Sequence, residues 1–508
     1  MAMASLIAIE RWERRARRHG WWVLLLVAAL CLLPGTGDLP LIDRDEPRFT
    51  RATVEMMETQ QWIIPFFNGD YRFDKPPLTY WWMRLHFLLL GEGELTARLH
   101  SVVSSLLCAW AIFGMGWRMF NARAGFLAGF AFLTCLQVLI HGRLAVADMP
   151  MVLAVIVIQW AAWELLRMPR FKPFTRAFWL LWFAVAFGFL AKGPIAVLVP
   201  GLTLLAYKCL QPRVDADTRR ANARLRWIGL AAFTVLYAGA VAVVAHKAPA
   251  ELVPKVWPAA GIGYAASIAI LLLTRNRRTL NLHRLQPFNG PALALTFVAM
   301  WGLPALSLTQ GAYWDVGIGR HVVERGVSAF NDRFYLPGVY YFVSAFISLM
   351  PWIAFAWAAV VKVRRNWDER SKFLVAWVAA PVVIFSFYQT QLPHYTLPGF
   401  AAVFLLLFRP AGEHQKRVGP LAALDGSRGE VRFFNTVVLV WVGVLAGLAI
   451  AAGQAPLAPG PMLNLRPALI ALALAGAGTL AVALGFRRRL RGGLLVAAGL
   501  ARSEEHTS

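Results

Sequence analysis

The chain has 508 residues, of which 58% are hydrophobic and only 15% are charged, and its mean hydropathy is +0.54. A soluble domain carries about 25% charged residues, so these values exclude a soluble enzyme and predict an integral membrane protein. The formal net charge is +24, but the basic residues fall in short runs between apolar spans. This placement indicates a positive-inside pattern and contact with membrane lipids, and it argues against nucleic acid as a partner.

Fourteen apolar segments are candidate membrane spans, because a helix needs about 20 apolar residues to cross the hydrocarbon. The count has a margin of one or two, and the prediction is an all-α polytopic membrane protein with about 12–14 transmembrane helices. The spans begin near Trp21, Ala97, Gly125, Met151, Phe178, Ile195, Trp227, Ala259, Pro291, Val339, Phe373, Leu397, Thr436 and Pro467. No small-residue cleavage pattern follows the first one, so it is interpreted as a retained span and not as a signal peptide.

The basic runs predict the orientation of these spans. If the arginines at 14–18 are cytoplasmic, alternation places the other basic runs inside as well. The outer side then receives the loop 37–95 and most of the motifs that contain Asp, His or Lys, so the working face is predicted to be non-cytoplasmic. Residues 1–410 are predicted to form the catalytic module, 411–433 a cytoplasmic connector, 434–492 further membrane helices, and 502–508 a non-native tail.

The first outer loop, residues 37–95, is predicted to contain two interfacial helices. Helical spacing of apolar residues in Pro47–Gln60 indicates an amphipathic helix lying in the membrane interface. Pro65, Asn68-Gly69 and Pro76-Pro77 predict turns. An aromatic-rich second helix is expected at Tyr80–Leu90.

Charged residues of this loop are the first candidates for chemistry, since charge held against a membrane is costly unless it serves a purpose. Asp45 and Glu46, close behind Asp43, stand where a helix would start. Asp45 could therefore cap that helix, or it could act as a base, a cation ligand or a partner of a sugar hydroxyl. Asp74 and Lys75 precede two prolines, and they are either rigidly aimed at a substrate or a surface ion pair.

Two further candidates lie between later spans. Asp148 closes a short outer connection, where it could serve only to form the turn. Lys192 ends one span before a Gly-Pro break, where it could snorkel to the interface or hold a lipid-linked phosphate.

The later outer segments add basic and aromatic groups. Arg320, His321 and Arg325 lie in one loop, and His394 with Tyr395 interrupts two spans. Arginine donates two parallel hydrogen bonds to phosphate, whereas a structural role for the two histidines is left open. Carboxylates and basic groups on one membrane face together favour a reaction on a polyisoprenyl-phosphate substrate.

Several motifs resemble those of the GT-C glycosyltransferases that use a lipid-phosphate sugar, above all the bacterial aminoarabinose transferases of lipid A and the protein-mannosyltransferase-like group. The resemblance covers residues 20–410 and is strongest in the first loop. It rests on Asp45-Glu46-x-Arg48, Trp62-Ile63-Ile64-Pro65, Phe73-Asp74-Lys75-Pro76-Pro77-Leu78-Thr79-Tyr80-Trp81, Asp148, Ala191-Lys192-Gly193 and Leu392–Pro398.

The resemblance implies roles for these residues. Asp45, with Glu46 beside it, corresponds to the catalytic acid of the first loop, and Asp148 to a second acid. Lys75 and Lys192 would contact the undecaprenyl-phosphate end of the donor. The remaining substrate-binding candidates are Arg48, Asp74, Arg320, His321, Arg325, His394 and Tyr395.

The implied reaction is an inverting transfer of a hexose or pentose from a polyprenyl-phosphate donor at the bacterial inner membrane, on its periplasmic face. The acceptor is a lipid A phosphate or a site on a protein or glycan. Relatives carry Glu where this chain has Asp74, and an outer C-terminal domain where this chain has apolar spans, so the sugar and acceptor stay open. No cofactor is assigned, and a divalent cation at Asp45 and Asp74 is left open.

Two other classes of function, a transporter and a scaffold protein, fit the sequence less well. A transporter or lipid flippase would place ionisable residues at mid-membrane in broken helices, whereas the acids here cluster at the outer boundary. A scaffold protein would not need the Asp-Lys-Pro-Pro segment. The enzyme is therefore the favoured interpretation.

Overall fold

The computed structural model describes residues 2–42, 44–212, 280–313, 339–388 and 391–410, together with short pieces between 234 and 447. Several predictions lie outside these residues. They concern Asp43, Arg320, His321 and Arg325, the spans near Trp227, Ala259 and Pro467, the connector 411–433, most of 434–492, and the tail 502–508.

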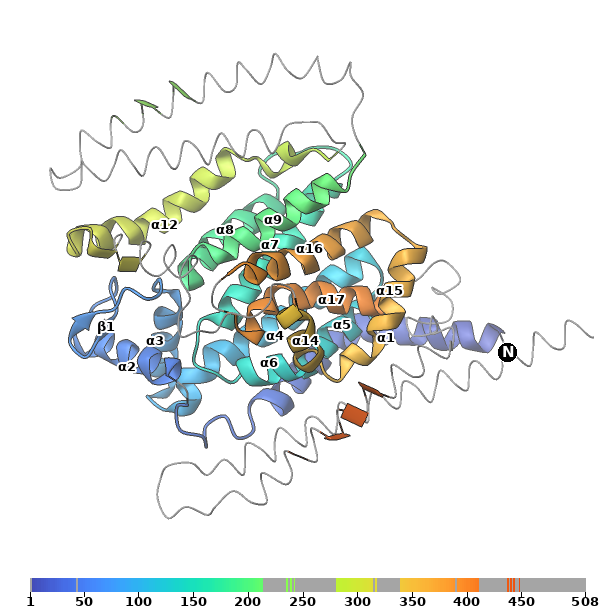
Figure 1. Ribbon diagram of the computed structural model, residues 1–508, viewed down its shortest axis with the longest axis horizontal. Helices are drawn as coiled ribbons and strands as arrows, with labels where there is room; N and C mark the ends of the chain where they lie inside the picture. The colour runs from blue at the N-terminus through green and yellow to red at the C-terminus, as the bar shows by residue number, and fades with distance from the viewer. Residues whose placement is uncertain are drawn as a thin grey trace, which may run out of the picture.

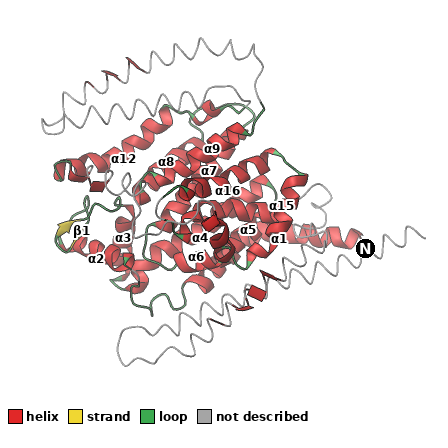
Figure 2. Ribbon diagram, viewed as in Figure 1, coloured by secondary structure: helices red, strands yellow, loops and turns green. Residues whose placement is uncertain are grey.

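Helices make up nearly all of the regular structure in the described part of the chain, which confirms the predicted all-α class (Figure 2). The helices of the main body are α1 (Ala2–Leu32), α4 (Glu94–Met119), α5 (Ala122–Thr134), α6 (Leu136–His141), α7 (Asp148–Arg167), α8 (Arg176–Lys192), α9 (Ile195–Cys209), α12 (Asn289–Leu308), α14 (Val339–Ser348), α15 (Ala356–Arg365), α16 (Glu369–Ser386) and α17 (Phe400–Phe408). Short 3-10 helices precede three of them, η1 (Leu282–Leu285), η3 (Trp352–Phe355) and η4 (Pro393–Gly399).

Three helical segments of the described residues are long and apolar enough to cross a membrane, namely Glu94–Met119, Asp148–Arg167 and Leu282–Leu308. A fourth would be the pair Val339–Ser348 and Trp352–Arg365, which bends by 110°. The total number of spans stays a prediction. One expected span differs, because the segment from Gly125 onward is broken at Cys135, whose extended backbone separates α5 from α6.

The centre of the molecule is a bundle in which α4, α5, α7, α16 and α17 lie side by side (Figure 1). Small residues allow the closest of these approaches: a Cβ atom on Gly116 of α4 would lie 2.5 Å from the Cα atom of Gly125 in α5. Membrane helices pack through such small residues because lipid supplies no hydrophobic drive between them. Large side chains, among them Trp352 and Trp377, are fully buried in the same core.

Residues 37–95, called the first loop below, contain two short helices and a turn at one edge of the bundle, as predicted (Figure 1). The helices are α2 (Asp45–Glu58) and α3 (Leu78–Leu90), and between them β1 (Phe66–Phe67) pairs antiparallel with β2 (Asp70–Tyr71). Asn68 and Gly69 have φ of +56° and +80°, as a two-residue hairpin turn with both central residues left-handed requires. Glu55 of α2 accepts hydrogen bonds from both of their backbone N–H groups.

Apolar packing fixes this loop on the bundle. Phe49, Tyr80 and Met83 share a buried cluster with Ala145 and Ala147, the residues that lead into α7. The indole N–H of Trp81 donates to the carbonyl of Trp62 at 2.6 Å, and that of Trp301 in α12 donates to the carbonyl of Ile63 at 2.7 Å. The loop therefore has one defined position relative to the start of α7 and to α12.

Candidate functional site

A buried ion pair between Glu46 and Arg98 ties the first loop to the helical bundle. Arg98, in α4, is 1% exposed and Glu46 is fully buried. Two parallel hydrogen bonds of 2.8 Å join the guanidinium group to the carboxylate. The remaining guanidinium donors bind the carbonyls of Thr36, Leu39 and Pro40. All five N–H donors of Arg98 are thus used.

The carboxylate of Glu46 is equally occupied. Besides Arg98, it accepts from the backbone N–H of Ile42 at 2.8 Å and from that of Ala145 at 2.7 Å. Four donors match the four acceptor sites of a carboxylate. Glu46 and Arg98 are called the Glu46–Arg98 anchor below, because this pair holds both the neighbouring Asp45 and the segment that leads to Asp148.

Asp45 is the first residue of α2 and its side chain is exposed. Arg44 occupies the N-cap position without a side-chain capping hydrogen bond, so Asp45 is not the cap that the sequence left open. The negative charge of Asp45 acts on Arg72 and on Tyr80. Arg48, one turn further along α2, is half-buried.

Arg72 is the centre of a second cluster in the first loop. Its guanidinium group lies 3.0 Å from the carboxylate of Asp74, and its Nε donates to the Tyr80 hydroxyl at 3.0 Å. The same group lies 5.6 Å from the ring centres of Phe49 and Phe67. Cation, carboxylate and aromatic faces thereby fix the backbone just before Lys75.

The electrostatics of this cluster favour a charged Arg72 and a neutral Tyr80. Burial opposes the charge of Arg72, but the Tyr80 hydroxyl and the carboxylates of Asp74 and Asp45 outweigh it and raise the pKa of Arg72. Burial raises the pKa of Tyr80 to about 12, because it outweighs the opposite effect of Arg72. Tyr80 thus remains a hydroxyl at neutral pH.

Lys75 lies at the junction of the first loop with α12. Its backbone carbonyl accepts a hydrogen bond of 3.0 Å from the Tyr313 hydroxyl. The Tyr313 ring packs edge-on against Phe73 and Trp301, with ring centres 5.4 and 5.1 Å away. The backbone of the Asp74-Lys75 segment is therefore held from both sides, and the Lys75 side chain is half-buried.

Asp148 and Lys192 form an ion pair at the meeting point of α7 and α8. Lys192 Nζ lies 2.5 Å from Asp148 Oδ1, and the two side chains are 17% and 10% exposed. Asp148 is the first residue of α7, and Lys192 is the last residue of α8 before the left-handed Gly193. Neither a turn-forming aspartate nor a snorkelling lysine describes this arrangement, since each side chain is directed to the other.

Two histidines extend the pair. His394, in η4, places Nε2 3.8 Å from Asp148 Oδ1, and its ring lies 4.5 Å from that of His141 in α6. His141 Nδ1 is 2.9 Å from the amide of Gln137, whose oxygen accepts from Ser348 in α14. The Tyr395 ring packs against Phe385 and edge-on against His394, with ring centres 4.5 and 5.0 Å away. The ends of five elements, α6, α7, α8, α14 and η4, thus meet in one polar network.

The structure gathers the predicted residues into two groups. The first contains Asp45, Asp74 and the Lys75 backbone, and the second contains Asp148, Lys192 and His394. Both border the segment 144–148, which leads into α7 and packs on the first loop.

Arg98, Arg72, Tyr80 and Gln137 are members of these networks that the sequence reasoning missed. A charged residue inside an otherwise apolar span is a usable signal, and it would have singled out Arg98. For Arg72 and Tyr80 there was none stronger than their presence in the charged loop.

The described residues contain no group of three or more His, Cys, Asp or Glu side chains placed to hold a metal ion. Asp74, one of the two cation ligands left open by the sequence, is paired with the Arg72 guanidinium. The donor set at Asp45 and Asp74 therefore does not fit a resident cation, and no chemistry is derived from one.

Comparison with known proteins supports the resemblance seen in the sequence. Residues 74–242 match the family described as "Dolichyl-phosphate-mannose-protein mannosyltransferase". The undecaprenyl phosphate-alpha-4-amino-4-deoxy-L-arabinose arabinosyl transferase of Serratia proteamaculans is 25% identical over 402 residues, which are 77% of this chain and 59% of that protein. The protein of the same name from Aeromonas salmonicida is 25% identical over 446 residues, or 87% of this chain and 66% of that protein.

This chain thus spans about three fifths to two thirds of the length of these relatives. Among solved structures, ArnT from Cupriavidus metallidurans bound to undecaprenyl phosphate superposes with a TM-score of 0.64 at 20% sequence identity. The superposition covers 93% of this chain and 73% of that one. The chain is therefore a membrane protein with the GT-C fold of the aminoarabinose transferases, to which it is similar in sequence.

Proposed function

We propose that the protein is a membrane glycosyltransferase that moves a sugar from a polyprenyl-phosphate donor to an acceptor on the outer face of the bacterial inner membrane. The observation that carries the proposal is the Asp148–Lys192 pair beside the first loop, where carboxylates and basic groups meet at the ends of membrane helices. The likeness to the arabinosyl transferases and to the undecaprenyl-phosphate-bound structure supports the same reaction class.

Asp45 and Asp148 are the proposed acids of the site, with Glu46 and Arg98 as positioning residues. Glu46 began as a catalytic candidate, but its carboxylate is saturated by four protein donors and has no capacity for a substrate. Asp45 is exposed and lies one residue away. The anchor thus supports the carboxylate that can reach a substrate.

The basic residues receive the donor phosphate in this proposal. Lys192 pairs with Asp148 in the structure, so the donor phosphate and the Asp148 carboxylate would both contact the Lys192 ammonium group. The Lys75 backbone is held by Tyr313, and in this proposal its ammonium group contacts the phosphate from the first loop. Opposite charge placed at the leaving group stabilises the charge that develops there. Arg48, His394 and the residues of the 320–325 loop remain candidate contacts of the substrate.

The reaction breaks the bond between the anomeric carbon and the phosphate oxygen. The acceptor oxygen forms a new bond to the same carbon from the opposite face, which inverts its configuration, and polyprenyl phosphate leaves with the electron pair. A phosphate acceptor is already anionic, so Asp45 would orient it. A hydroxyl acceptor would lose its proton to Asp45, because the carboxylate of Asp148 is already engaged by Lys192.

Two acceptor classes are supported by different observations. The similarity to the arabinosyl transferases, together with the sequence motifs that resemble those of the aminoarabinose transferases of lipid A, favours a lipid A phosphate as the acceptor. The family description of residues 74–242 favours a protein as the acceptor. Lipid A is the first candidate because the similarity to the arabinosyl transferases extends over most of the chain.

The experiment is transfer from labelled polyprenyl-phosphate sugars in proteoliposomes that contain either lipid A or a glycosylatable peptide. Asp45→Asn is expected to lower transfer to a hydroxyl acceptor by about 100-fold or more, the range in which a positioned base acts, and to lower transfer to a lipid A phosphate by less, because that acceptor has no proton to lose. Asp70→Asn is the matched control, since Asp70 is an exposed carboxylate of the same loop, in β2. Undiminished transfer by D45N would refute its role, and movement of the donor across the bilayer without cleavage would instead indicate a transporter.

The orientation has its own test. A cysteine introduced at Asp70 should react with a membrane-impermeant maleimide added to intact spheroplasts, because the first loop is proposed to face the periplasm. Labelling only after the membrane is opened would place the loop, and with it the site, on the cytoplasmic side.

A further inference from the structure

A second polar site lies at the other end of the bundle. Asp148 begins α7, whereas Glu164 near the end of α7 pairs with Arg118 near the end of α4 at 3.6 Å. Phe120 and Asn121, which follow α4 directly, line a pocket of about 860 Å³. Glu164 follows Asp148 by 16 residues, so roughly 24 Å of helix separates Asp148 from the Glu164–Arg118 pair next to this pocket.

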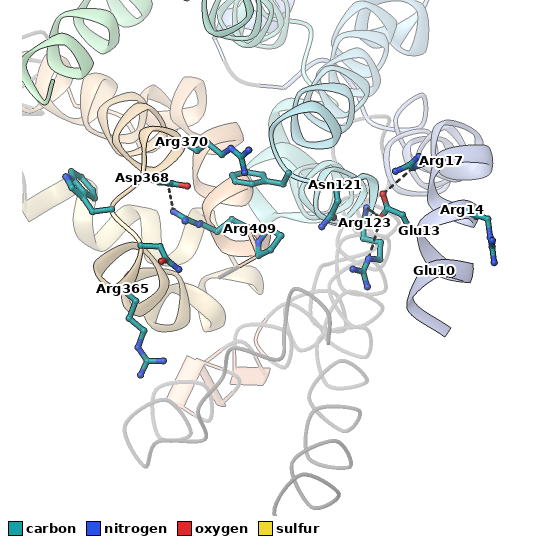
Figure 3. A pocket seen from close by; sticks show the side chains of 14 residues that line it. Glu10, Glu13, Arg14, Arg17, Asn121, Arg123, Arg365, Asp368, Arg370 and Arg409 are labelled. Carbon is teal, nitrogen blue, oxygen red and sulfur yellow. Dashed lines mark hydrogen bonds and ion pairs between the residues drawn. The ribbon is translucent and has the colours of Figure 1, made fainter. Parts of the chain in front are cut away.

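The pocket is strongly basic. Arginines come from four separate parts of the chain, α1, the start of α5, the α15–α16 junction and the end of α17 (Figure 3). Six arginines face three carboxylates, an excess of three positive charges. The arginines are Arg14, Arg17, Arg123, Arg365, Arg370 and Arg409.

Two of the three carboxylates are already engaged by protein donors. Glu13 accepts from the backbone N–H groups of Ala122 and Arg123, at 2.8 and 3.1 Å, and also lies 3.4 Å from the guanidinium groups of Arg17 and Arg123. Asp368 caps α16 through the N–H of Ser371 and pairs with Arg409. Figure 3 shows these two pairs on opposite sides of the pocket. The six arginines thus keep an excess of three positive charges over the carboxylates of the pocket.

Two of the arginines are held out of water. Arg123 is 3% exposed and Arg409 is 2% exposed. The Nε of Arg409 is buried and reaches no acceptor within the described residues. Arg409 already pairs with Asp368, but its unused buried donor is costly unless a further acceptor approaches it.

Two aromatic residues, Phe120 and Trp367, stand among the uncharged lining residues beside Asn121, Asn366 and Pro410, and they indicate the kind of anion. Trp367 is 46% exposed at the rim, and the Phe120 ring lies 5.5 Å beneath the guanidinium group of Arg370. Trp side chains are enriched where a membrane meets water, and arginine forks match phosphate oxygens. A ligand with a phosphate group and an apolar tail fits both features.

We propose that this pocket binds the phosphate headgroup of an anionic phospholipid on the cytoplasmic side of the membrane. The phosphate diester would lie between the arginines of α1 and those of the α15–α16 junction, and its acyl chains would extend past Trp367 into the bilayer. Such a ligand would offset the surplus charge and link the N-terminal helix to the later half of the bundle.

The test measures binding of phosphatidylglycerol to the full-length protein in a neutral detergent by native mass spectrometry. Arg14→Gln with Arg370→Gln removes two exposed pocket arginines, which should leave the fold intact. Arg15→Gln with Arg364→Gln is the control, because these exposed arginines belong to the same parts of the chain but do not line the pocket. We expect the affinity of the pocket double variant to fall about ten-fold, and that of the control by less than about two-fold, since two charge-assisted hydrogen bonds are lost only in the former.

Equal losses in the two variants would overturn the proposal, because they would show a general attraction between basic protein and anionic lipid. Inorganic phosphate is the second probe. Displacement of the lipid only by other anionic lipids supports the headgroup site, whereas full displacement by inorganic phosphate at low concentration would assign the pocket to a soluble phosphate compound instead.

Discussion

The Glu46–Arg98 anchor gives the sharpest quantitative prediction. Glu46→Gln keeps the shape of the side chain but leaves the Arg98 guanidinium buried without its counter-charge. Removing one partner of a buried ion pair costs about 3–5 kcal/mol, and the low end applies here because the glutamine oxygen can still accept a hydrogen bond. Arg98→Leu is expected to reach the high end, since it also strips the carbonyls of Thr36, Leu39 and Pro40 of their donor.

Hydrogen exchange read by mass spectrometry locates the effect. The N–H groups of Ile42 and Ala145 both donate to Glu46, so their exchange reports whether the anchor is open. A loss of about 3–5 kcal/mol corresponds to exchange faster by roughly a hundred- to several thousand-fold. Transfer activity should fall with it, because Asp45 and the segment before Asp148 lose their common support.

The control for this prediction is Glu58→Gln. Glu58 also pairs with an arginine, Arg51, but both side chains are about half exposed. Its loss should leave the exchange of Ile42 and Ala145 unchanged. If E46Q and E58Q gave the same exchange, the anchor would not hold the loop and its proposed positioning role would be refuted.

Three further predictions concern the pairs and turns around the site. Lys192→Met leaves the buried Asp148 carboxylate without its lysine partner and should destabilise the protein by about 3–5 kcal/mol. The double variant D148N/K192M should regain thermal stability without regaining transfer, and a double variant as unstable as K192M would contradict the pairing. Burial acts against the charged form of Glu55, but the N–H groups of Gly69 and Asn68 and the Arg51 side chain outweigh it and lower the pKa of Glu55. The contribution of Glu55 to hairpin stability is therefore complete above the usual glutamate pKa near 4.5, and it is lost as the pH falls through the lower pKa of the folded state. Proteolysis at the hairpin should increase in acid for the natural protein, whereas E55Q should be cleaved equally on both sides of that pH range. Gly69→Ala should cost about 1 kcal/mol through its left-handed backbone alone, because an added Cβ meets no neighbour, whereas Gly201→Ala in α9 should cause no loss of thermal stability.

The first loop shows how far local sequence signals reach. The spacing of Phe49, Val54 and Met57 predicted an amphipathic helix, and the Asn68-Gly69 pair predicted a turn; the structure contains the helix and the turn, and the position of the helix in the membrane interface stays a prediction. These features depend on hydrophobic periodicity and on backbone conformations that only a few residue types adopt. The Gly193-Pro194 break after Lys192 was predictable for the same reason.

The partners of the charged residues could not be read in this way. Asp148 and Lys192 are 44 residues apart, and Glu46 and Arg98 are 52 apart, so only the packing of α7 on α8 and of the first loop on α4 brings them together. From the sequence, Glu46 and Asp45 were both candidate catalytic acids. In the structure, Glu46 is buried and accepts four hydrogen bonds, which gives it a positioning role instead. Likewise, the arginines of α1, α5, α16 and α17 looked like separate positive-inside runs until the fold placed them around one pocket.

By itself, the sequence determined that the chain is a helical membrane protein, that its charged loop lies between the first spans, and which motifs it shares with lipid-phosphate-dependent glycosyltransferases. These properties follow from composition and from short-range patterns. The tertiary structure alone decided which carboxylates are saturated and which face outward. Charge pairing in a membrane protein depends on distances of a few ångströms between helices, and those distances are set by the packing of the whole bundle.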